Sequence, residues 1–347
     1  FPEMDPLSLG VPGMHGTAYA NLAMDGADLI VCVGARFADR VIGDAERFAR
    51  KARVIHIDVD PAEIGKVIPV DIPIVGDARQ VLVALLEELQ PHVDKLPDFS
   101  PWHAQIAAWK AEYPLKWSVD GERSCPNREN GERCDADHCG STACPGRHGT
   151  IKGPAVIRAL WEATDGRAIV TTDVGQHQMW AMQYYQVREP RQFISSAGLG
   201  TMGFGLPAAI GAQLGNPEKE VWCISGDGSL QMLAKELATA VIHHLPIKIA
   251  LLNNGCLGMV RQMQAYFFGE RYTQVGLNVG TPDFVKLAEA YGCAAIRVID
   301  QADIPTAIAE ARKVTDRPVL IDFICDAEEM VLPMIPGGKS VAEMILP

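Results

Sequence analysis

The second half of this sequence contains a strand-and-turn pattern that constrains the fold more than any other feature. Residues 220–225 have the apolar composition of a buried strand, a helix is predicted over 230–243, and a second apolar strand covers 247–252. A strand, a helix and another strand in this order are typical of a parallel sheet. We therefore expect the carboxyl ends of the two strands to be neighbours, at the edge where α/β sheets bind ligands.

Polar residues follow both of these strands. Asp227 lies in the Gly-Asp-Gly-Ser run 226–229, and Asn254 is the second of two asparagines at the end of the next strand. A carboxylate and an amide that converge there offer Mg²⁺ hard oxygen ligands. Gly226 and Gly228 let the backbone approach a ligand, and the amides that open the following helix favour an anion. The pattern predicts a site for a metal-bound diphosphate; the alternative is a simple turn between strand and helix.

Length and composition set the broad class. With 347 residues and 48% hydrophobic content, the chain exceeds a usual domain of roughly 100–200 residues, so we expect two folded units. The net charge of −12, without a stripe rich in Lys and Arg, argues against general nucleic-acid binding. The sequence offers no apolar stretch near the roughly 20 residues that a membrane span needs.

The cysteines and the first residue bear on the cellular location. Nine cysteines, several of them single in apolar segments, fit reduced thiols in a cytoplasmic enzyme better than a disulfide framework. Because the chain opens with Phe1 just before a motif, we expect that an upstream part has been lost. An organellar targeting segment would have been lost with it.

We expect an α/β chain of two Rossmann-like parallel-sheet domains. The first is residues 1–95, the second is 151–347 with a carboxy-terminal tail, and 96–150 form a linker with a Cys-rich stretch. Further buried strands are expected at 28–33, 53–58, 168–171 and 319–323, and further helices at 78–90, 102–117 and 203–214.

Two other segments are expected on the same ligand-binding rim. Gln176 and His177, preceded by Gly175, follow a strand, and their neutral side chains are expected to hold the terminal phosphate. The alternative is that His177 only caps the next helix. Gly200 and Met202 belong to a glycine series before another helix, a pattern that close helix packing also favours.

The Gly-Asp-Gly, helix and Asn-Asn arrangement resembles the thiamin diphosphate signature of enzymes that decarboxylate or ligate 2-keto acids. The resemblance implies that Asp227, Asn254 and the main-chain carbonyl of Cys256 bind Mg²⁺. It also implies that Met232 projects into the crevice and forces the cofactor into a V shape, although a Met on a helix is more often part of a core. In that shape the cofactor serves as the electron sink for decarboxylation.

Three sequence segments narrow the resemblance to the acetolactate synthase, or acetohydroxyacid synthase, catalytic large-subunit family. They are residues 13–16 and 33–41 near the start and 332–340 near the end. The resemblance implies a carboligase that condenses pyruvate with pyruvate or 2-ketobutyrate, with loss of CO₂. The product is 2-acetolactate or 2-aceto-2-hydroxybutyrate, for branched-chain amino-acid synthesis. It further implies a homodimer or tetramer of catalytic subunits that can also bind a small regulatory subunit. Because the activating glutamate of that family lies in an N-terminal domain, this chain is expected to be inactive alone.

The resemblance also implies that the first domain binds FAD in a structural role. The residues agree in part, because Gly34 ends a strand where a pyrophosphate can approach, Arg36 and Arg40 are cationic, and Asp58 ends the next strand. Without the family, NAD would be an equal alternative. The implied FAD residues are Met14, His15, Gly34, Ala35, Arg36, Arg40, Asp58, Val59, Gly76 and Asp77.

The resemblance implies a larger set of residues at the thiamin diphosphate site. The cofactor-binding residues are Gly175, Gln176, His177, Gly200, Met202, Gly226, Asp227, Gly228, Ser229, Met232, Asn254, Gly258 and Met259, and the residues next to the chemistry are Met232, Met259 and Met263. Two positions depart from the family. Met263 stands where a Trp commonly shapes the pocket for the second keto acid, and Ala38 replaces an acidic residue of the flavin loop.

Residues 125–148 depart from the family and leave another function open. They hold four cysteines and two histidines but no paired C-x₂-C knuckles, so a zinc or iron–sulfur site and a plain surface insertion are both consistent with them. The rival functions are therefore a related thiamin-dependent decarboxylase or oxidase, and a non-catalytic metal-binding module.

Overall fold

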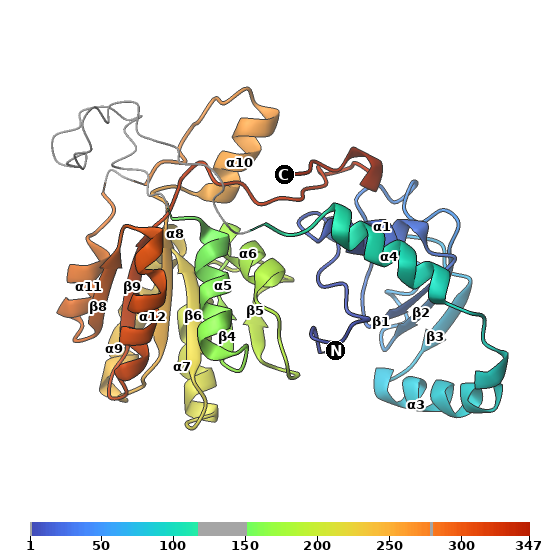
Figure 1. Ribbon diagram of the computed structural model, residues 1–347, viewed down its shortest axis with the longest axis horizontal. Helices are drawn as coiled ribbons and strands as arrows, with labels where there is room; N and C mark the ends of the chain where they lie inside the picture. Colours follow the sequence, from blue (N-terminus) through green and yellow to red (C-terminus); the bar gives the residue numbers. More distant parts are fainter. Residues whose placement is uncertain (1, 117–150, 278–279) are drawn as a thin grey trace. The chain divides into compact units, whose positions relative to one another are not determined.

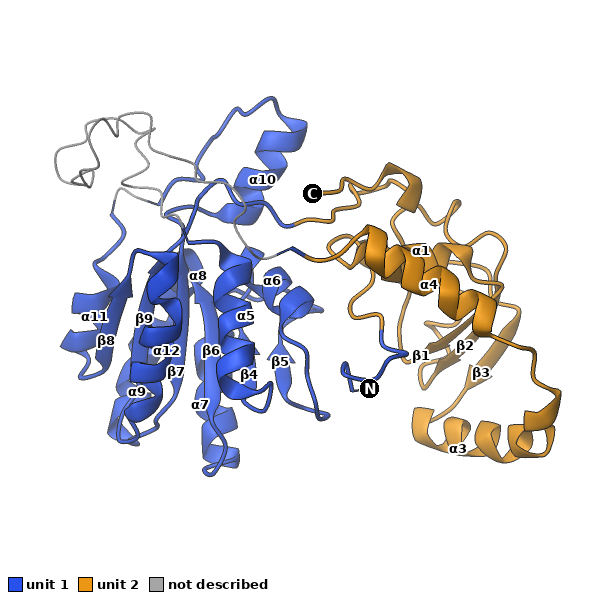
Figure 2. Cartoon of the chain, in the orientation of Figure 1, with its two compact units in different colours: residues 1–8, 116–331 blue, residues 9–115, 332–347 orange. Residues whose placement is uncertain are grey.

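The computed structural model describes residues 2–116, 151–277 and 280–347, which form two compact α/β units (Figure 2). Unit 1 comprises residues 1–8 and 116–331, and unit 2 comprises residues 9–115 and 332–347. Each unit is built on a sheet of parallel strands, which confirms the predicted fold class. The Cys-rich stretch 125–148, with its predicted metal ligands, lies outside the described residues.

Unit 1 has a six-stranded parallel sheet in the order β5-β4-β6-β7-β9-β8 (Figure 1). Its strands are β4 (Ile169–Thr172), β5 (Phe193–Ser195), β6 (Val221–Gly226), β7 (Lys248–Asn253), β8 (Ala294–Val298) and β9 (Val319–Ile324). Its helices are α5 (Gly153–Thr164), α6 (Gln176–Tyr184), α7 (Gly205–Gly215), α8 (Asp227–Leu233), α9 (Leu237–Ile242), α10 (Gly258–Phe267), α11 (Phe284–Ala290) and α12 (Ile304–Lys313), with 3₁₀ turns η2 (Ala234–Glu236) and η3 (Gln301–Asp303).

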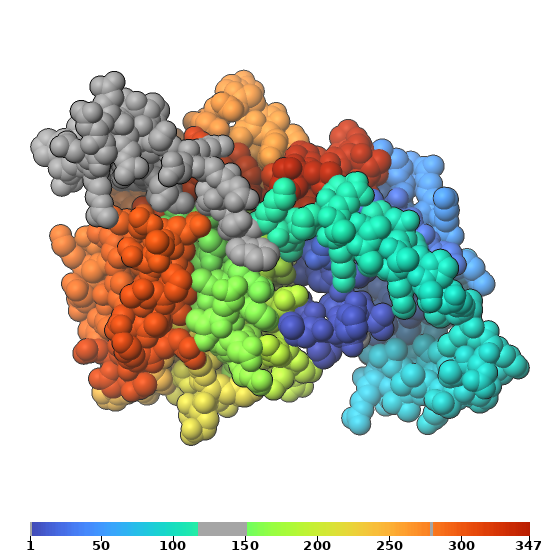
Figure 3. Space-filling view, in the orientation of Figure 1, coloured from blue at the N-terminus to red at the C-terminus, as the bar shows by residue number. Residues whose placement is uncertain are grey.

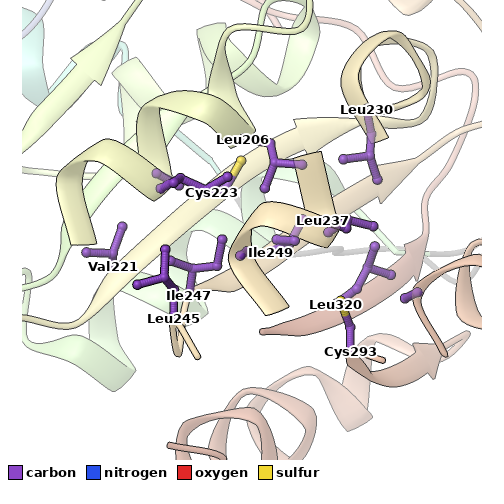
Figure 4. Close-up of a cluster of buried hydrophobic side chains, with 14 of the residues drawn as sticks. Leu206, Val221, Cys223, Leu230, Leu237, Leu245, Ile247, Ile249, Cys293 and Leu320 are labelled. Carbon is purple, nitrogen blue, oxygen red and sulfur yellow. The ribbon is translucent and has the colours of Figure 1, made fainter. Parts of the chain in front are cut away.

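Helices cover both faces of this sheet. α5 and α12 pack together on the face toward the viewer in Figure 1. On the other face, apolar residues of α7, α8, α9 and α11 form one cluster with the strands, part of which Figure 4 shows around Leu206, Leu237 and Ile249. The central strands are continuous apolar runs because both of their faces are buried.

The strands predicted at 168–171, 220–225, 247–252 and 319–323 are confirmed within one residue as β4, β6, β7 and β9. The single helix predicted over 230–243 is wrong. α8 already begins at Asp227, and the non-helical backbone of Leu233, with φ −133° and ψ 28°, separates it from η2 and α9. The glycine motif is therefore the first turn of a helix, where backbone amides have no partner within the helix and favour an anion.

Unit 2 has a three-stranded parallel sheet in the order β1-β2-β3. Its elements are α1 (Ala18–Gly26), β1 (Leu29–Val33), α2 (Asp39–Ile42), β2 (Arg53–Asp58), β3 (Ile72–Val75), α3 (Ala78–Leu89), η1 (Gln90–Lys95), α4 (Ser100–Glu112) and η4 (Val341–Glu343). A small core of five buried side chains lies beside the sheet: Cys32, Phe37, Ile42, Val54 and Ile68.

The prediction that 28–33 form a buried strand is only half right. β1 is a parallel strand, but Leu29, Val31 and Val33 are each more than a third exposed, whereas Cys32 is buried. Successive side chains of a strand point to opposite faces, so one face of β1 packs on the core and the other is partly exposed. The described residues include no helix that is both long and apolar enough for a bilayer crossing.

The carboxy-terminal tail packs on unit 2. Ile335 N donates to Met14 O at 2.8 Å, Asp44 N donates to Lys339 O at 3.1 Å, and Arg47 pairs with Glu343 at 2.8 Å. The sequence-based division had kept this tail with the second domain. Its hydrogen bonds instead make it part of the compact unit that holds residues 9–115.

Candidate functional site

The candidate site lies at the carboxyl ends of β4, β6 and β7. β6 and β7 are parallel neighbours, with Gly226 opposite Leu252, so the predicted adjacency of Asp227 and Asn254 is confirmed. β4 lies between β5 and β6, which places the chain's change of direction between β4 and β6. A crevice opens at such a switch point because the connecting helices leave to opposite faces of the sheet.

A pocket of about 200 Å³ occupies this crevice. It is lined by the loop before α6, the start of α8 and the segment from β7 into α10. Its lining residues are Val174, Gly175, Gln176, His177, Met179, Trp180, Met202, Gly226, Asp227, Gly228, Ser229, Leu252, Asn254, Cys256, Leu257, Gly258, Met259 and Val260. Twelve predicted site residues are among them, and three are not: Gly200, Met232 and Met263.

Asp227 is the buried acid of the pocket. Its side chain is 2% exposed, and its two oxygens accept from Gly228 N at 2.8 Å and from Gly255 N at 2.7 Å. Burial raises the pKa of Asp227 to about 7 against the opposing effect of these amides. A cation at this carboxylate would favour the ionised form, so the site has the charge preference of a metal ligand.

Asn254 is oriented by Gln176. Asn254 Nδ2 donates to Gln176 Oε1 at 3.2 Å, and Asn254 Oδ1 accepts from Cys256 N at 3.3 Å. Gly258 leaves the space for this pair, because a Cβ there would lie 1.9 Å from Gln176 Oε1. The glycine at the start of α10 therefore has a steric role in the pocket.

Cys256, the predicted carbonyl ligand, is held by its neighbours. Leu257 N donates to Val275 O and Leu277 N donates to Gly255 O, both at 2.8 Å. Burial raises the pKa of the Cys256 thiol to about 12, so the thiol stays protonated. A carbonyl contribution from this residue, without its thiol, is thus consistent with its surroundings.

His177 has an unpartnered ring nitrogen in the pocket wall. The residue is buried, its Nε2 has no hydrogen-bond partner, and the ring lies against the backbone of Gly175 and Gly226. Burial lowers the pKa of His177 to about 3, so the ring is neutral near pH 7. A buried ring nitrogen without a partner is costly, and a ligand in the pocket would supply its missing hydrogen bond.

Asp173 is a structural residue of the site that sequence reasoning did not single out. Its carboxylate accepts from the backbone amides of Val174, Gly203 and Gly205 at 2.9, 2.8 and 3.2 Å. It therefore fixes the glycine series to the end of β4. An acidic residue directly after a buried strand was the available signal.

The three predicted residues outside the pocket lining have different surroundings. Met232 is 55% exposed on α8, Gly200 is exposed with a φ of +65°, and Met263 is partly buried on α10. Figure 3 shows the segment around α10 projecting at the upper edge of unit 1. Their roles at the cofactor site therefore stay predictions.

The predicted FAD residues gather at one edge of unit 2. Gly34 and Ala35 follow β1, Asp58 and Val59 end or follow β2, and Gly76 and Asp77 follow β3. Near them, Arg40 Nη1 donates to Met14 Sδ at 3.6 Å and Met14 N donates to Arg40 O at 2.7 Å. Carboxyl ends of parallel strands bind nucleotide cofactors in α/β folds.

Two of these residues already have local hydrogen bonds. Asp77 Oδ1 accepts from Gln80 N at 3.0 Å as the N-cap of α3, and Asp58 Oδ1 accepts from Asp60 N at 2.9 Å. Asp77 therefore has a helix-capping role whether or not a cofactor binds. The hydrogen bond from Asp60 uses one of the two carboxylate oxygens of Asp58.

The donor set fits Mg²⁺ and a diphosphate. Asp227 and Asn254 offer oxygens, and the unpartnered Nε2 of His177 and the first turn of α8 lie on the same crevice. A metal held by several His, Cys, Asp or Glu side chains is a different type of site, and the described ranges contain no group of three such residues. The pocket matches a cation that is shared with phosphate oxygens.

Comparison with known proteins supports the same reading. The model "Thiamine pyrophosphate enzyme, C-terminal TPP binding domain" matches residues 173–323, and "Thiamine pyrophosphate enzyme, central domain" matches residues 1–85. The first match contains every residue of the pocket.

Similar proteins include several acetolactate synthases. The acetolactate synthase large subunit of Corynebacterium glutamicum is 44% identical over 99% of this chain and 51% of its own length. The isozyme 3 large subunit of Escherichia coli is 41% identical over 100% of this chain and 56% of its own length, and the chloroplastic enzyme of rice is 43% identical over 100% and 50%. The chain thus spans about half the length of these curated relatives.

Proposed function

This chain belongs to the thiamine pyrophosphate enzyme family, and from that premise we propose that it forms the diphosphate-binding and flavin-binding part of an acetolactate synthase large subunit. The proposed reaction joins pyruvate, with loss of CO₂, to pyruvate or 2-ketobutyrate. The observation that carries the proposal is the convergence of Asp227, Asn254 and the unpartnered His177 on one crevice at the switch point of the sheet.

In the proposed site each residue has a definite task. The Asp227 carboxylate, the Asn254 Oδ1 and the Cys256 carbonyl would hold Mg²⁺, which in turn would hold the diphosphate. His177, in the tautomer that carries its proton on Nε2, and amides in the first turn of α8 would donate to phosphate oxygens. Met202, Leu257 and Met259 supply apolar wall and exclude water from the inner part of the pocket.

When bound, thiamin diphosphate supplies the electron sink that a decarboxylation of a 2-keto acid requires. The chain's own contribution is to bind and orient that group. Met232 and Met263 would then face the substrates from the exposed surface of α8 and α10, and the exposed state of Met232 suits a surface that a further domain covers. We propose that this domain, from another subunit, supplies the activating carboxylate.

FAD is proposed at the edge of unit 2 formed by residues 34–35, 58–59 and 76–77. Support comes from the positive φ of Gly34, +63°, where a Cβ would meet no atom within 4 Å, and from the nearby cationic Arg40. Such an opening next to a strand end lets a pyrophosphate approach the backbone. The proposed partners are further catalytic subunits in a dimer or tetramer and a small regulatory subunit.

Calorimetric titration with thiamin diphosphate, with and without Mg²⁺, tests the central proposal. The expected result is metal-dependent binding of thiamin diphosphate, which Asp227→Ala abolishes. The chain on its own is expected to show no carboligase activity. Binding without any metal dependence would contradict the proposed site. In a preparation with carboligase activity, acetolactate as the product would distinguish the proposed reaction from a simple decarboxylation, which yields acetaldehyde, or an oxidation, which yields acetyl phosphate.

A further inference from the structure

Gln262 is a fully buried amide on α10, 0% exposed. Its side chain pairs with the backbone of Val331 in both directions, because Val331 N donates to Oε1 at 2.8 Å and Nε2 donates to Val331 O at 3.0 Å. A side-chain amide can pair with a backbone N–H and C=O at the same time in only one orientation, with its oxygen toward the N–H and its nitrogen toward the C=O. The main chain at Val331 therefore fixes which end of Gln262 is the oxygen.

This orientation is passed to Gln176. Gln262 Oε1 also accepts from Gln176 Nε2 at 3.1 Å, and Glu329 O accepts from the same nitrogen at 2.9 Å. Two acceptors on one side hold the nitrogen end of Gln176 toward them. Its oxygen end must then point the other way, where it accepts from Asn254 Nδ2 at 3.2 Å.

The last member of the chain is Asn254. Because its Nδ2 is engaged by Gln176, its Oδ1 faces the side where Cys256 N donates at 3.3 Å, in the pocket that Asp227 also lines. A rotated amide would present hydrogens to a cation instead of a lone pair. The orientation of this one amide thus decides whether the residue is a metal ligand.

We propose that Gln262 is a positioning residue for the metal site. A relay of three side-chain amides, from Gln262 through Gln176 to Asn254, carries the orientation set by the Val331 backbone to the oxygen that faces the cation. The inference rests on the proposed function, since it takes Asp227 and Asn254 as the cation's ligands. It also couples the position of α10, which carries Met259, to the affinity for the metal.

The chain offers a matched control on the same helix. Gln264 clamps another backbone segment in the same bidentate manner, with Nε2 donating to Thr273 O at 3.1 Å and Oε1 accepting from Thr273 N at 2.9 Å. That clamp is exposed, and both of its hydrogen bonds go to Thr273 rather than to the relay. Gln264→Met removes the same kind of hydrogen bonds from α10 and leaves the relay intact.

The test is calorimetric titration of the whole chain with thiamin diphosphate at a series of Mg²⁺ concentrations. Gln262→Met is expected to raise the half-saturating Mg²⁺ concentration by about tenfold to a hundredfold, the usual effect of losing a partner that orients a metal ligand. Gln264→Met is expected to leave it within about twofold while it also lowers the unfolding temperature. If Gln262→Met does not fold, Gln262→Asn keeps an amide that is one methylene too short to reach both partners, and the same weakening is expected.

Three outcomes would overturn the proposal. No metal-dependent binding by the unmodified chain would remove the metal site, and with it both the proposed function and the relay. Normal metal dependence in the Gln262 variants would refute the relay alone. Equal weakening by the Gln262 and Gln264 variants would assign the effect to general loosening of α10.

Discussion

Replacing Gly258 by Ala tests the packing at the centre of the pocket. The new Cβ would lie 1.9 Å from Gln176 Oε1, 2.6 Å from Gln176 Cδ and 2.9 Å from Asn254 Nδ2, whereas ordinary contacts begin at 3.4 Å. Gln176 Oε1 would have to retreat by about 1.5 Å, which breaks the 3.2 Å hydrogen bond to Asn254. The substitution therefore disturbs the proposed metal ligand without touching its own atoms.

The magnitude follows from the competing effects. Forced repacking costs about 1–3 kcal/mol and the lost hydrogen bond about 1 kcal/mol, while Ala gains up to about 1 kcal/mol of helix propensity over Gly. We expect a net loss of about 1–3 kcal/mol in the free energy of unfolding. The displaced Asn254 is expected to weaken Mg²⁺-dependent binding of thiamin diphosphate by about tenfold to a hundredfold.

Calorimetric titration and thermal unfolding measure the two effects. Gly211→Ala is the matched control, because Gly211 lies inside α7 and a Cβ there meets no atom within 4 Å. It should gain up to about 1 kcal/mol of stability and bind as the unmodified chain does. If Gly258→Ala bound with unchanged affinity, the close approach of Gln176 and Asn254 would have no role in ligand binding.

Three further predictions concern titration and charge. Because burial raises the pKa of Asp227 from 3.8 to about 7, the stability of the metal-free chain should fall as pH rises between these values. Over the same range the affinity for Mg²⁺ with thiamin diphosphate should rise, up to about pH 7. An affinity that calorimetry finds unchanged between about pH 5.5 and 7.5 would contradict this prediction. Because burial lowers the pKa of His177 from 6.5 to about 3, stability should be lost as pH falls through this range. His177→Gln should therefore flatten the dependence of the unfolding temperature on pH between about 7 and 5. Parallel curves of unfolding temperature against pH for the variant and the unmodified chain would refute this prediction. Arg297→Met removes the half-exposed cation that pairs with the fully buried Asp322 and should cost about 1–3 kcal/mol in denaturant unfolding. Lys286→Met, at a side chain that is 83% exposed, should cost less than about 0.5 kcal/mol, and equal effects would refute a stabilising role for the Arg297–Asp322 pair.

The part of the site that follows strand ends could be predicted from the sequence. A strand with an apolar run and a polar residue directly after it has only one placement in a parallel sheet, so Asp227, Asn254 and His177 were found at one edge. Gly258 was included by resemblance, but its steric reason needed coordinates.

Residues that act through long-range pairing could not be predicted in this way. Gln262 is a polar residue inside an amphipathic helix, and only the fold places Val331 opposite it. The break after Leu233 and the exposed side of β1 have the same origin, since helix spacing and apolar content report local preference and not what packs against each face.

Each unit is made of two separate segments of the chain, residues 1–8 and 116–331 in unit 1 and residues 9–115 and 332–347 in unit 2. This division affects the order in which the units are completed during synthesis. Residues 9–115 of unit 2 are made before nearly all of unit 1, yet the hydrogen bond from Ile335 N to Met14 O can form only after residue 331 has been made. Segments emerge from the ribosome from the amino terminus onward. Unit 2 must therefore wait, incomplete, until the whole of unit 1 has been translated, and neither unit can be transferred to another protein as one continuous piece of gene.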